Sequence, residues 1–296
     1  LCSSVKKIET QPSSGIPELF FEKRTAMSFL QAVILGVVQG LTEFLPISSS
    51  GHLVLGEYLL KVKFDDISFE VFLHLGTSLA VVIFFRHSIW KMLKAVYLKT
   101  KSLLMNRGAT SYQDEDWRLF WLIVLGSVPA GLIGVGFKDI FEKSFSSVKL
   151  VSVMLLFTGS ILFLTRFFKG LREKLKWGDA VWIGLAQAIA ILPGVSRSGA
   201  TISAGIFRGV EPGRAAEFSF LLSLPAVLGA GVLELKDVIN QLNMNQGLRI
   251  YLAGAVTACI VGYLSIKFLL KVIKRGKFQY FGYYCFTLGL FFLIFT

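Results

Sequence analysis

The sequence predicts an all-α integral membrane protein with six transmembrane helices and two re-entrant helical hairpins in an inverted repeat. Hydrophobic residues make up 54% of the 296 residues and charged residues 17%, whereas charged residues make up about 25% of a typical soluble domain. The apolar residues also lie in long continuous blocks rather than in amphipathic stripes or in alternation. Because lipid requires every backbone polar group to be paired internally, such blocks favour membrane helices. They exclude a soluble enzyme, a disordered protein, a coiled coil and a β-barrel.

Six apolar segments reach the roughly 20 residues that a membrane-spanning helix needs. They cover residues 69–86, 117–137, 149–168, 216–233, 250–270 and 279–296. Two more apolar stretches, 28–60 and 178–207, are interrupted by polar runs. Residues 1–26 are polar and lack an apolar core. We therefore expect them to be a disordered or non-native extension of a single membrane domain, residues 27–296.

The distribution of Lys and Arg predicts the direction of each span. The connections 86–118, 166–176 and 267–277 hold seven, five and five basic residues, and basic connections favour the cytoplasmic side. The six spans then alternate in direction only if both interrupted stretches return to the side from which they enter. We therefore expect 28–60 to be a re-entrant hairpin from the outer side and 178–207 to be one from the cytoplasm.

An internal repeat supports this arrangement. When the chain is shifted by 148 residues, half its length, the two interrupted stretches align on their polar breaks. The identical pairs are Gly36 with Gly184, Gln39 with Gln187, Ser48 with Ser196, Ser50 with Ser198 and Gly51 with Gly199. Each half, about 27–147 and 175–296, holds one hairpin and three spans, and an odd number of spans inverts the second copy. Inverted repeats with broken helices have their binding site where the halves meet.

Both breaks carry polar residues at membrane depth, where such groups cost free energy unless they line a cavity or a site. The first break offers a carboxylate, an imidazole and several hydroxyls, and the second offers a guanidinium and several hydroxyls. The candidate residues are Gln39, Glu43, Ser48, Ser49, Ser50 and His52 in the first break, and Ser196, Arg197, Ser198 and Thr201 in the second. Glu70 and His74, near the start of a span, are interpreted as packing or interface residues.

The residue types at the breaks predict a pocket for a phosphate-bearing lipid. Each break precedes a helical stretch, so free backbone N–H groups of a helix N-terminus would face it, and such N-termini bind anions. Arg197 adds a forked donor suited to phosphate oxygens. Taken alone, either break is equally well interpreted as a kink, and Glu43 has an alternative interpretation as a structural carboxylate. The pairing of the two breaks by the repeat favours a site.

Two long motifs at these residues closely resemble the bacterial undecaprenyl-diphosphate phosphatase family of the bacitracin-resistance type. The motifs are Gln39-Gly-Leu-Thr-Glu43-Phe-Leu-Pro-Ile-Ser-Ser-Ser-Gly-His52 and Pro193-Gly-Val-Ser-Arg197-Ser-Gly-Ala-Thr201. The resemblance covers residues 28–296 and includes either Glu or Gln at the position of Gln39. A role that needs a charge is therefore not expected of Gln39.

The resemblance implies a multi-pass hydrolase of the bacterial plasma membrane. Such an enzyme removes the terminal phosphate of undecaprenyl diphosphate and so recycles the lipid carrier for peptidoglycan synthesis. The resemblance also implies a divalent cation, Mg²⁺ or Ca²⁺, and a pocket that opens to the outer face. The functional positions that it implies are Glu43, Ser49, His52, Arg197 and Thr201.

Two nucleophiles remain open for this reaction. Ser49 attacks with His52 as its base, which we favour slightly, or His52 attacks and forms a phosphohistidine while Glu43 orients the imidazole. In both schemes Glu43 binds the cation together with the substrate, since hard cations prefer oxygen ligands. The diphosphate is held by Arg197, Ser196, Ser198, Thr201, Ser48 and Ser50, with Gln39 in support.

Two other classes of function remain open. A polyprenyl-phosphate transporter or flippase would use the same inverted repeat without a nucleophile, and a structural membrane partner would need neither Glu43 nor Arg197. The expected partners are the bilayer and a polyprenyl diphosphate lipid. Nothing predicts a nucleic-acid partner, and the oligomeric state, a homodimer included, stays open.

Overall fold

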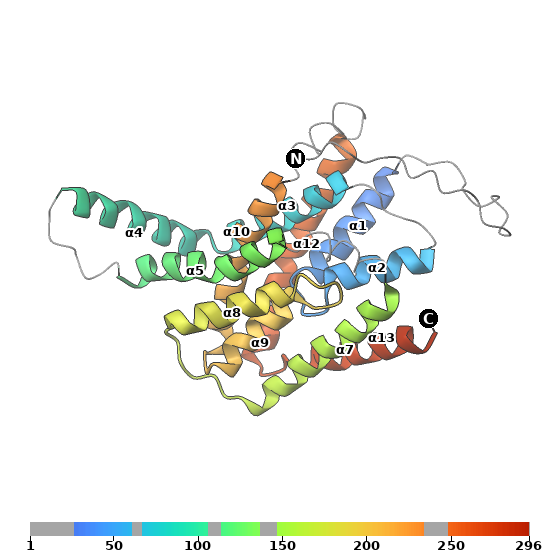
Figure 1. The fold of residues 1–296 in the computed structure, drawn as a ribbon. Coiled ribbons are helices and arrows are strands. Elements are labelled where there is room, and N and C mark those ends of the chain that lie inside the picture. Colours follow the sequence, from blue (N-terminus) through green and yellow to red (C-terminus); the bar gives the residue numbers. More distant parts are fainter. Residues whose placement is uncertain (1–26, 61–66, 106–113, 137–146, 234–247, 296) are drawn as a thin grey trace.

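The computed structural model describes residues 27–60, 67–105, 114–136, 147–233 and 248–295. Within these ranges the chain is helical, and the only β-type pairing is an isolated bridge between Arg172 and Val210. The expected N-terminal extension and the connection 234–247 lie outside the described residues. Figure 1 shows the helices as a set of antiparallel and crossing pairs around one centre.

Each of the six apolar segments forms a helix. In chain order the helices are α1 (Phe29–Thr42), α2 (Ser49–Leu60), α3 (Ile67–Phe84), α4 (Arg86–Leu104), α5 (Asp114–Gly136), α7 (Val148–Leu164), η2 (Thr165–Phe167, a 3-10 helix), α8 (Trp177–Ile189), α9 (Arg197–Phe207), α10 (Pro212–Leu233), α12 (Leu248–Lys274) and α13 (Tyr280–Phe295). By length and composition α5, α7, α10 and α12 can each cross a membrane. Helix α3 passes the same test only together with α4, from which it is bent by 78°, and α13 is a shorter apolar helix of 16 residues. These apolar helices are those of a multi-pass membrane protein.

Both predicted breaks are present, and they meet. Helix α1 ends at Thr42 and α2 begins at Ser49, while α8 ends at Ile189 and α9 begins at Arg197. The two connecting turns approach each other at the centre of the molecule (Figure 1), and the hydroxyl of Ser198 donates to the carbonyl of Leu45 across them at 3.4 Å. The broken helices therefore bring the starts of α2 and α9 together.

The two later helices, α2 and α9, begin in the same way. The hydroxyl of Ser48 accepts the backbone N–H of Gly51 at 3.1 Å, and the hydroxyl of Ser196 accepts that of Gly199, also at 3.1 Å. A serine at this position satisfies one of the N–H groups that a helix start leaves free. Ser48 adopts a φ of 67°, a conformation that costs of order 1–3 kcal/mol for a residue other than glycine and is concentrated at functional sites.

The two earlier helices, α1 and α8, are also packed alike. A Cβ at Gly36 of α1 would lie 2.6 Å from the carbonyl oxygen of Gly254 in α12. A Cβ at Gly184 of α8 would lie 2.2 Å from the carbonyl oxygen of Gly126 in α5. Small residues allow such close contact of helix backbones, which drives helix association in lipid. Equivalent glycines thus seat each broken helix on a long apolar helix.

The start of α8 and the end of α9 are joined by ions. Asp179 is fully buried, and its carboxylate accepts from Arg172 at 2.6 Å and from the Nε of Arg208 at 3.2 Å. Arg172 also donates to the carbonyl of Arg208 at 2.8 Å. The stretch 178–207 therefore begins and ends at the same place in the molecule, as a hairpin does.

Candidate active site

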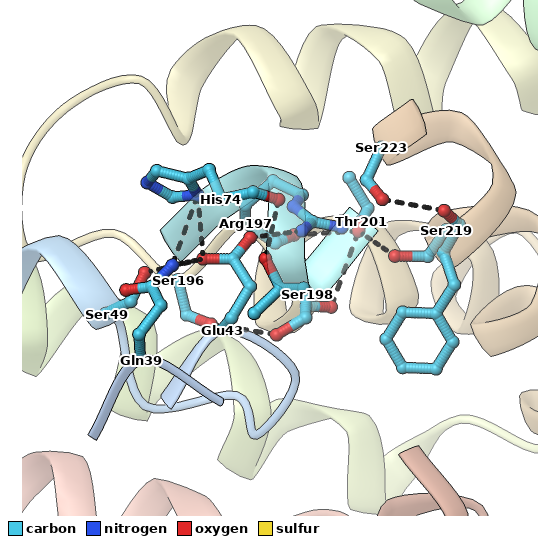
Figure 2. Close-up of polar contacts among 12 residues, drawn as sticks. Gln39, Glu43, Ser49, His74, Ser196, Arg197, Ser198, Thr201, Ser219 and Ser223 are labelled. Carbon is cyan, nitrogen blue, oxygen red and sulfur yellow. Dashed lines mark hydrogen bonds and ion pairs between the residues drawn. The ribbon is translucent and has the colours of Figure 1, made fainter. Parts of the chain in front are cut away.

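Glu43 is the centre of a buried polar cluster where the two breaks meet. It follows the last residue of α1, and only 8% of its side chain is exposed. Its Oε1 accepts from Arg197 at 2.5 Å, and its Oε2 accepts from the hydroxyl of Ser49 at 2.9 Å and from the amide of Gln39 at 3.1 Å. Figure 2 shows Gln39 and Ser49 on one side of this carboxylate and Arg197 on the other. The chain thus brings a hydroxyl and a guanidinium, 148 residues apart, to one carboxylate.

Arg197 has donor capacity left after its contact with Glu43. It is the first residue of α9, so it lies at a helix N-terminus, where anions are favoured. Its side chain is 18% exposed, and its Nη1 is buried without a hydrogen-bond partner among the described residues. A buried guanidinium N–H group without a partner is an expensive arrangement unless a ligand completes it. An oxygen of a phosphate group is the partner that a guanidinium fork suits best.

The other predicted serines are used within the protein. The hydroxyls of Ser48 and Ser196 cap α2 and α9. Each also lies 3.3 Å from the hydroxyl of the serine two positions later, which is Ser50 or Ser198. Ser48, Ser196 and Ser198 are buried, whereas Ser50 is partly exposed. The hydroxyls of Ser48 and Ser196 therefore hold the helix starts in place, since each satisfies a backbone N–H group that a helix start leaves free.

Thr201 supports Arg197 from one turn further along α9. Its hydroxyl donates to the carbonyl of Arg197 at 2.7 Å, and Ser219 of α10 lies 2.5 Å from the same hydroxyl. Thr201 and Ser219 are both fully buried. Figure 2 shows Thr201, Ser219 and Ser223 continuing from Arg197 away from Glu43. Thr201 thus fixes the turn that carries Arg197, and its hydroxyl is used in contacts within the protein.

His52 does not pair with Ser49, contrary to the scheme in which it serves as the base. Its Nδ1 lies 2.7 Å from the carbonyl of Ser48 and its Nε2 lies 2.7 Å from the hydroxyl of Tyr284 in α13. A carbonyl only accepts, so Nδ1 carries the proton and Nε2 accepts from Tyr284. Within the described residues the partner of the Ser49 hydroxyl is Glu43. The second scheme needs a contact between Glu43 and this imidazole. Among the described residues the contacts of Glu43 are instead to Arg197, Ser49, Gln39 and His74.

The sequence interpretation missed His74. Its Nδ1 accepts from the amide of Gln39 at 3.2 Å and lies 3.7 Å from Glu43 Oε2, and its Nε2 lies 3.7 Å from Glu70. It therefore belongs to the Glu43 cluster and is not a packing residue. Two ionisable groups four positions apart in an apolar helix were the signal, since such residues usually mark a functional site. Tyr284 gave no comparable signal, because nothing near it in the sequence is polar enough to mark it.

The residue that follows Glu43 belongs to the apolar core. Phe44, which follows Glu43, is 1% exposed and meets Phe220 of α10 edge to face, with ring centroids 5.6 Å apart. Phe218 is equally buried. Glu43 and Arg197 are themselves only 8% and 18% exposed, and low exposure to water strengthens the electrostatic interaction between them.

Comparisons with known proteins show the family to which the chain belongs. A model of the family described as bacitracin resistance protein BacA matches residues 32–291. The chain belongs to this family. An undecaprenyl-diphosphatase from Desulforapulum autotrophicum is 43% identical over 274 residues, which are 89% of this chain and 97% of that protein. Undecaprenyl-diphosphatases from Desulfosudis oleivorans and Methanobrevibacter smithii are 44% and 42% identical, over 89% of this chain and 97% and 96% of theirs. The Glu43 cluster lies entirely within the residues that the bacitracin resistance family model matches.

Proposed function

We propose that this protein is a membrane phosphatase that hydrolyses undecaprenyl diphosphate to undecaprenyl phosphate and inorganic phosphate. The observation that carries this function is the Ser49 hydroxyl held by Glu43 at 2.9 Å beside Arg197, whose Nη1 has no partner among the described residues. A nucleophile, a proton acceptor and an anion-binding group are the parts that phosphoryl transfer needs. The names of the relatives support the lipid diphosphate as the substrate.

The arrangement in the membrane that we propose has six crossing helices, α3, α5, α7, α10, α12 and α13, and two re-entrant hairpins, α1–α2 and α8–α9. The hairpins would be the equivalent parts of an inverted repeat. The identical serine caps, the equivalent glycine contacts and the joined ends of the α8–α9 hairpin support this arrangement. The basic connections support a pocket that opens to the outer face of the bacterial plasma membrane.

In the reaction that we infer, the oxygen of Ser49 attacks the terminal phosphorus of the diphosphate. Glu43 accepts the hydroxyl proton along the hydrogen bond that already joins them. The bond from this phosphorus to the bridging oxygen breaks, and undecaprenyl phosphate leaves with the electron pair. Water then attacks the phosphoserine, the bond to the serine oxygen breaks, and Glu43 returns its proton to Ser49. Inorganic phosphate leaves with the oxygen and the two hydrogens of the water. Arg197 and the N–H groups at the starts of α2 and α9 stabilise the negative charge in both steps.

His52 has a supporting part in this reaction. Its contacts with Ser48 and Tyr284 connect the start of α2 to α13, so it positions the turn on which Ser49 lies. Gln39 donates to both Glu43 and His74, which holds the carboxylate oxygen that faces Ser49. Both residues would therefore act through others and not on the substrate.

The carboxylate of Glu43 suits a divalent cation that is bound jointly by the protein and the substrate. Within the described residues no group of three His, Cys, Asp or Glu side chains lies close enough to hold an ion, and Glu43 already accepts three hydrogen bonds. Mg²⁺ is commonly held by one or two carboxylates together with substrate phosphates. Glu43 would thus be the protein ligand of Mg²⁺ or Ca²⁺, and the ion would supply positive charge that offsets the diphosphate.

An apolar groove beside α9 suits the prenyl chain. It has a volume of about 350 Å³ and is lined by side chains of α7, α8 and α9, including Phe157, Ile161, Trp182, Ala200, Ala204 and Phe207. Ala200 and Ala204 lie three and seven positions after Arg197, so all three share one face of the helix. A lipid whose phosphate meets Arg197 could therefore lay its chain along this face.

Phosphate release by the purified protein tests the proposed function. We expect release from undecaprenyl or farnesyl diphosphate in the presence of Mg²⁺ or Ca²⁺, loss with a chelator, and recovery when the cation returns. Lipid binding without any phosphate release would contradict the phosphatase and favour a flippase. Phosphate release that a chelator leaves unchanged would show that the reaction needs no cation, while the proposed hydrolysis would stand.

A further inference from the structure

A charged cavity lies where the end of α3 faces the last turns of α12. Its volume is about 430 Å³, and it is lined by four cations, Lys267, Lys271, Lys274 and Arg275, together with Phe84 and Leu270. The three lysines recur at four and three positions, so they share one face of α12. None of the lining residues belongs to the Glu43 cluster.

The positive charge of this cavity is not compensated within the described residues. No acidic side chain lines it, and none of its four cations takes part in an ion pair in the part of the chain that the structure describes. Arg172, Arg197, Arg208 and Arg214, by contrast, all face carboxylates. Four like charges around one cavity create a strong local potential for an anion.

The cavity lies at a change from apolar to polar surface. Helix α12 is long and apolar enough to cross a membrane, and its lysines gather in its last turns. Helix α3 ends at Phe84, and α4 leaves it at 78°. If α3 crosses the bilayer, α4 therefore lies nearly along its surface.

The exposed face of α4 supports this position. Trp90, Leu93 and Tyr97 are 70%, 49% and 63% exposed, and their spacing of three and four residues puts them on one side of the helix. Trp and Tyr are enriched where membrane meets water. Lys91, Lys94 and Lys101 are also exposed on α4. The cavity thus opens at the level of lipid headgroups.

We propose that this cavity binds the phosphate group of an anionic phospholipid of the surrounding bilayer. The fork of Arg275 would donate two hydrogen bonds to the oxygens of a phosphodiester, and the lysines would act as point charges around it. Phe84 and Leu270 are apolar and would meet the first carbons of the acyl chains. Basic pockets between membrane helices bind anionic lipid headgroups by the same means.

Retention of lipid by the full-length protein tests this site. The protein is purified in a neutral detergent, exposed to phosphatidylglycerol or to phosphatidylcholine, and the bound lipids are counted by native mass spectrometry. We expect phosphatidylglycerol to be retained and phosphatidylcholine to be lost. The double variant Lys271→Gln with Lys274→Gln should bind phosphatidylglycerol about tenfold more weakly, since each basic residue near anionic lipid strengthens binding by several-fold. The matched control is Lys149→Gln with Lys169→Gln, which removes two exposed lysines outside the cavity and should bind as the wild type does.

Two further arms separate the sources of the phosphate group. Inorganic phosphate at millimolar concentration should not displace phosphatidylglycerol, and displacement would mean that the cavity takes a soluble anion instead. Equal retention of both lipids, or equal binding by the cavity variant and the control variant, would also overturn the proposal. Phosphate release by the double variant in phosphatidylcholine reports on its fold and should equal that of the wild type. If this variant does not fold, Arg275→Gln should give the same order of affinities.

Discussion

The two helix breaks share a pattern of serine and glycine residues and differ at positions before, within and after that pattern. Both have a serine that caps the next helix, a second serine two positions on and a glycine after it. At the position of Glu43, however, the second break has Ile191, at that of Ser49 it has Arg197, and at that of His52 it has Ala200. The shared residues build the helix starts, and the residues that differ include those to which we assign the chemistry.

The two glutamines show the same division. Gln39 donates to Glu43 and to His74. Its equivalent, Gln187, is buried, and neither atom of its amide has a partner among the described residues. Leu222 stands where the first half has His74. One half has therefore kept the polar partners of this glutamine, and the other half has apolar residues in their place.

Removal of the Glu43 charge should have the largest effect. Glu43→Gln keeps the shape of the side chain but removes the proton acceptor of Ser49, so we expect kcat to fall about 1000-fold, within the range for loss of a general base. Phosphate release under saturating substrate measures the change. The control is Ile191→Val at the equivalent position of the second break, which should stay near wild type. A Glu43→Gln enzyme with more than a tenth of wild-type activity would contradict the role of this carboxylate.

Arg197→Lys tests the contribution of the second break. The charge remains, but the fork that reaches both Glu43 and a phosphate oxygen is lost. We expect kcat/KM to fall about 100-fold, comparable to the loss of one oxyanion donor. Steady-state kinetics with a water-soluble prenyl diphosphate would measure it. Unchanged kcat/KM would mean that the second break provides only charge, or no substrate contact at all.

Substitution of the two glutamines compares the halves directly. Gln39→Leu removes a donor to a charged group, so activity should fall about tenfold. Gln187→Leu should leave activity within about twofold and should not lower stability, because an unpaired buried amide costs about 1–3 kcal/mol. Phosphate release and thermal unfolding in detergent provide the two measurements. Equal losses of activity would show that both halves share the chemistry.

Loss of the caps should have the smallest effect and should be the same in both halves. Ser48→Ala and Ser196→Ala each remove a side-chain acceptor at a helix start, so each should lower the free energy of unfolding by about 1 kcal/mol. Denaturant unfolding of the two variants in the same detergent measures the difference between them. A much larger loss of activity than of stability in either variant would indicate that its hydroxyl meets the substrate.

Much of the helical architecture follows from the sequence, because long apolar runs and positions of Pro, Gly and Ser determine where helices lie and where they end. The helical character of the six apolar segments and the two breaks were confirmed. The bend between α3 and α4 and the helix that continues to Leu104 were not predicted. A count of basic residues identifies a connection as cytoplasmic, but it does not reveal whether that connection is helical.

The site was less predictable, because it depends on contacts between distant segments. The repeat predicted that Glu43 and Arg197 lie at one site, and in the structure Arg197 donates to Glu43 at 2.5 Å. His52 lies three positions after Ser49 on α2, but its ring contacts Ser48 and Tyr284 of α13 instead of Ser49. That orientation depends on Tyr284, 232 residues away, and no local pattern encodes such a contact. The role of His52 as the base of Ser49 stays a prediction.

Identification of the residue that carries the phosphoryl group tests the proposed mechanism most directly. The purified protein is mixed briefly with a prenyl diphosphate labelled in its terminal phosphate, quenched in acid, digested and mapped by mass spectrometry. Label on Ser49, absent in Ser49→Ala and reduced in Glu43→Gln, is the expected result. Label on His52, or steady turnover by Ser49→Ala, would contradict Ser49 as the nucleophile.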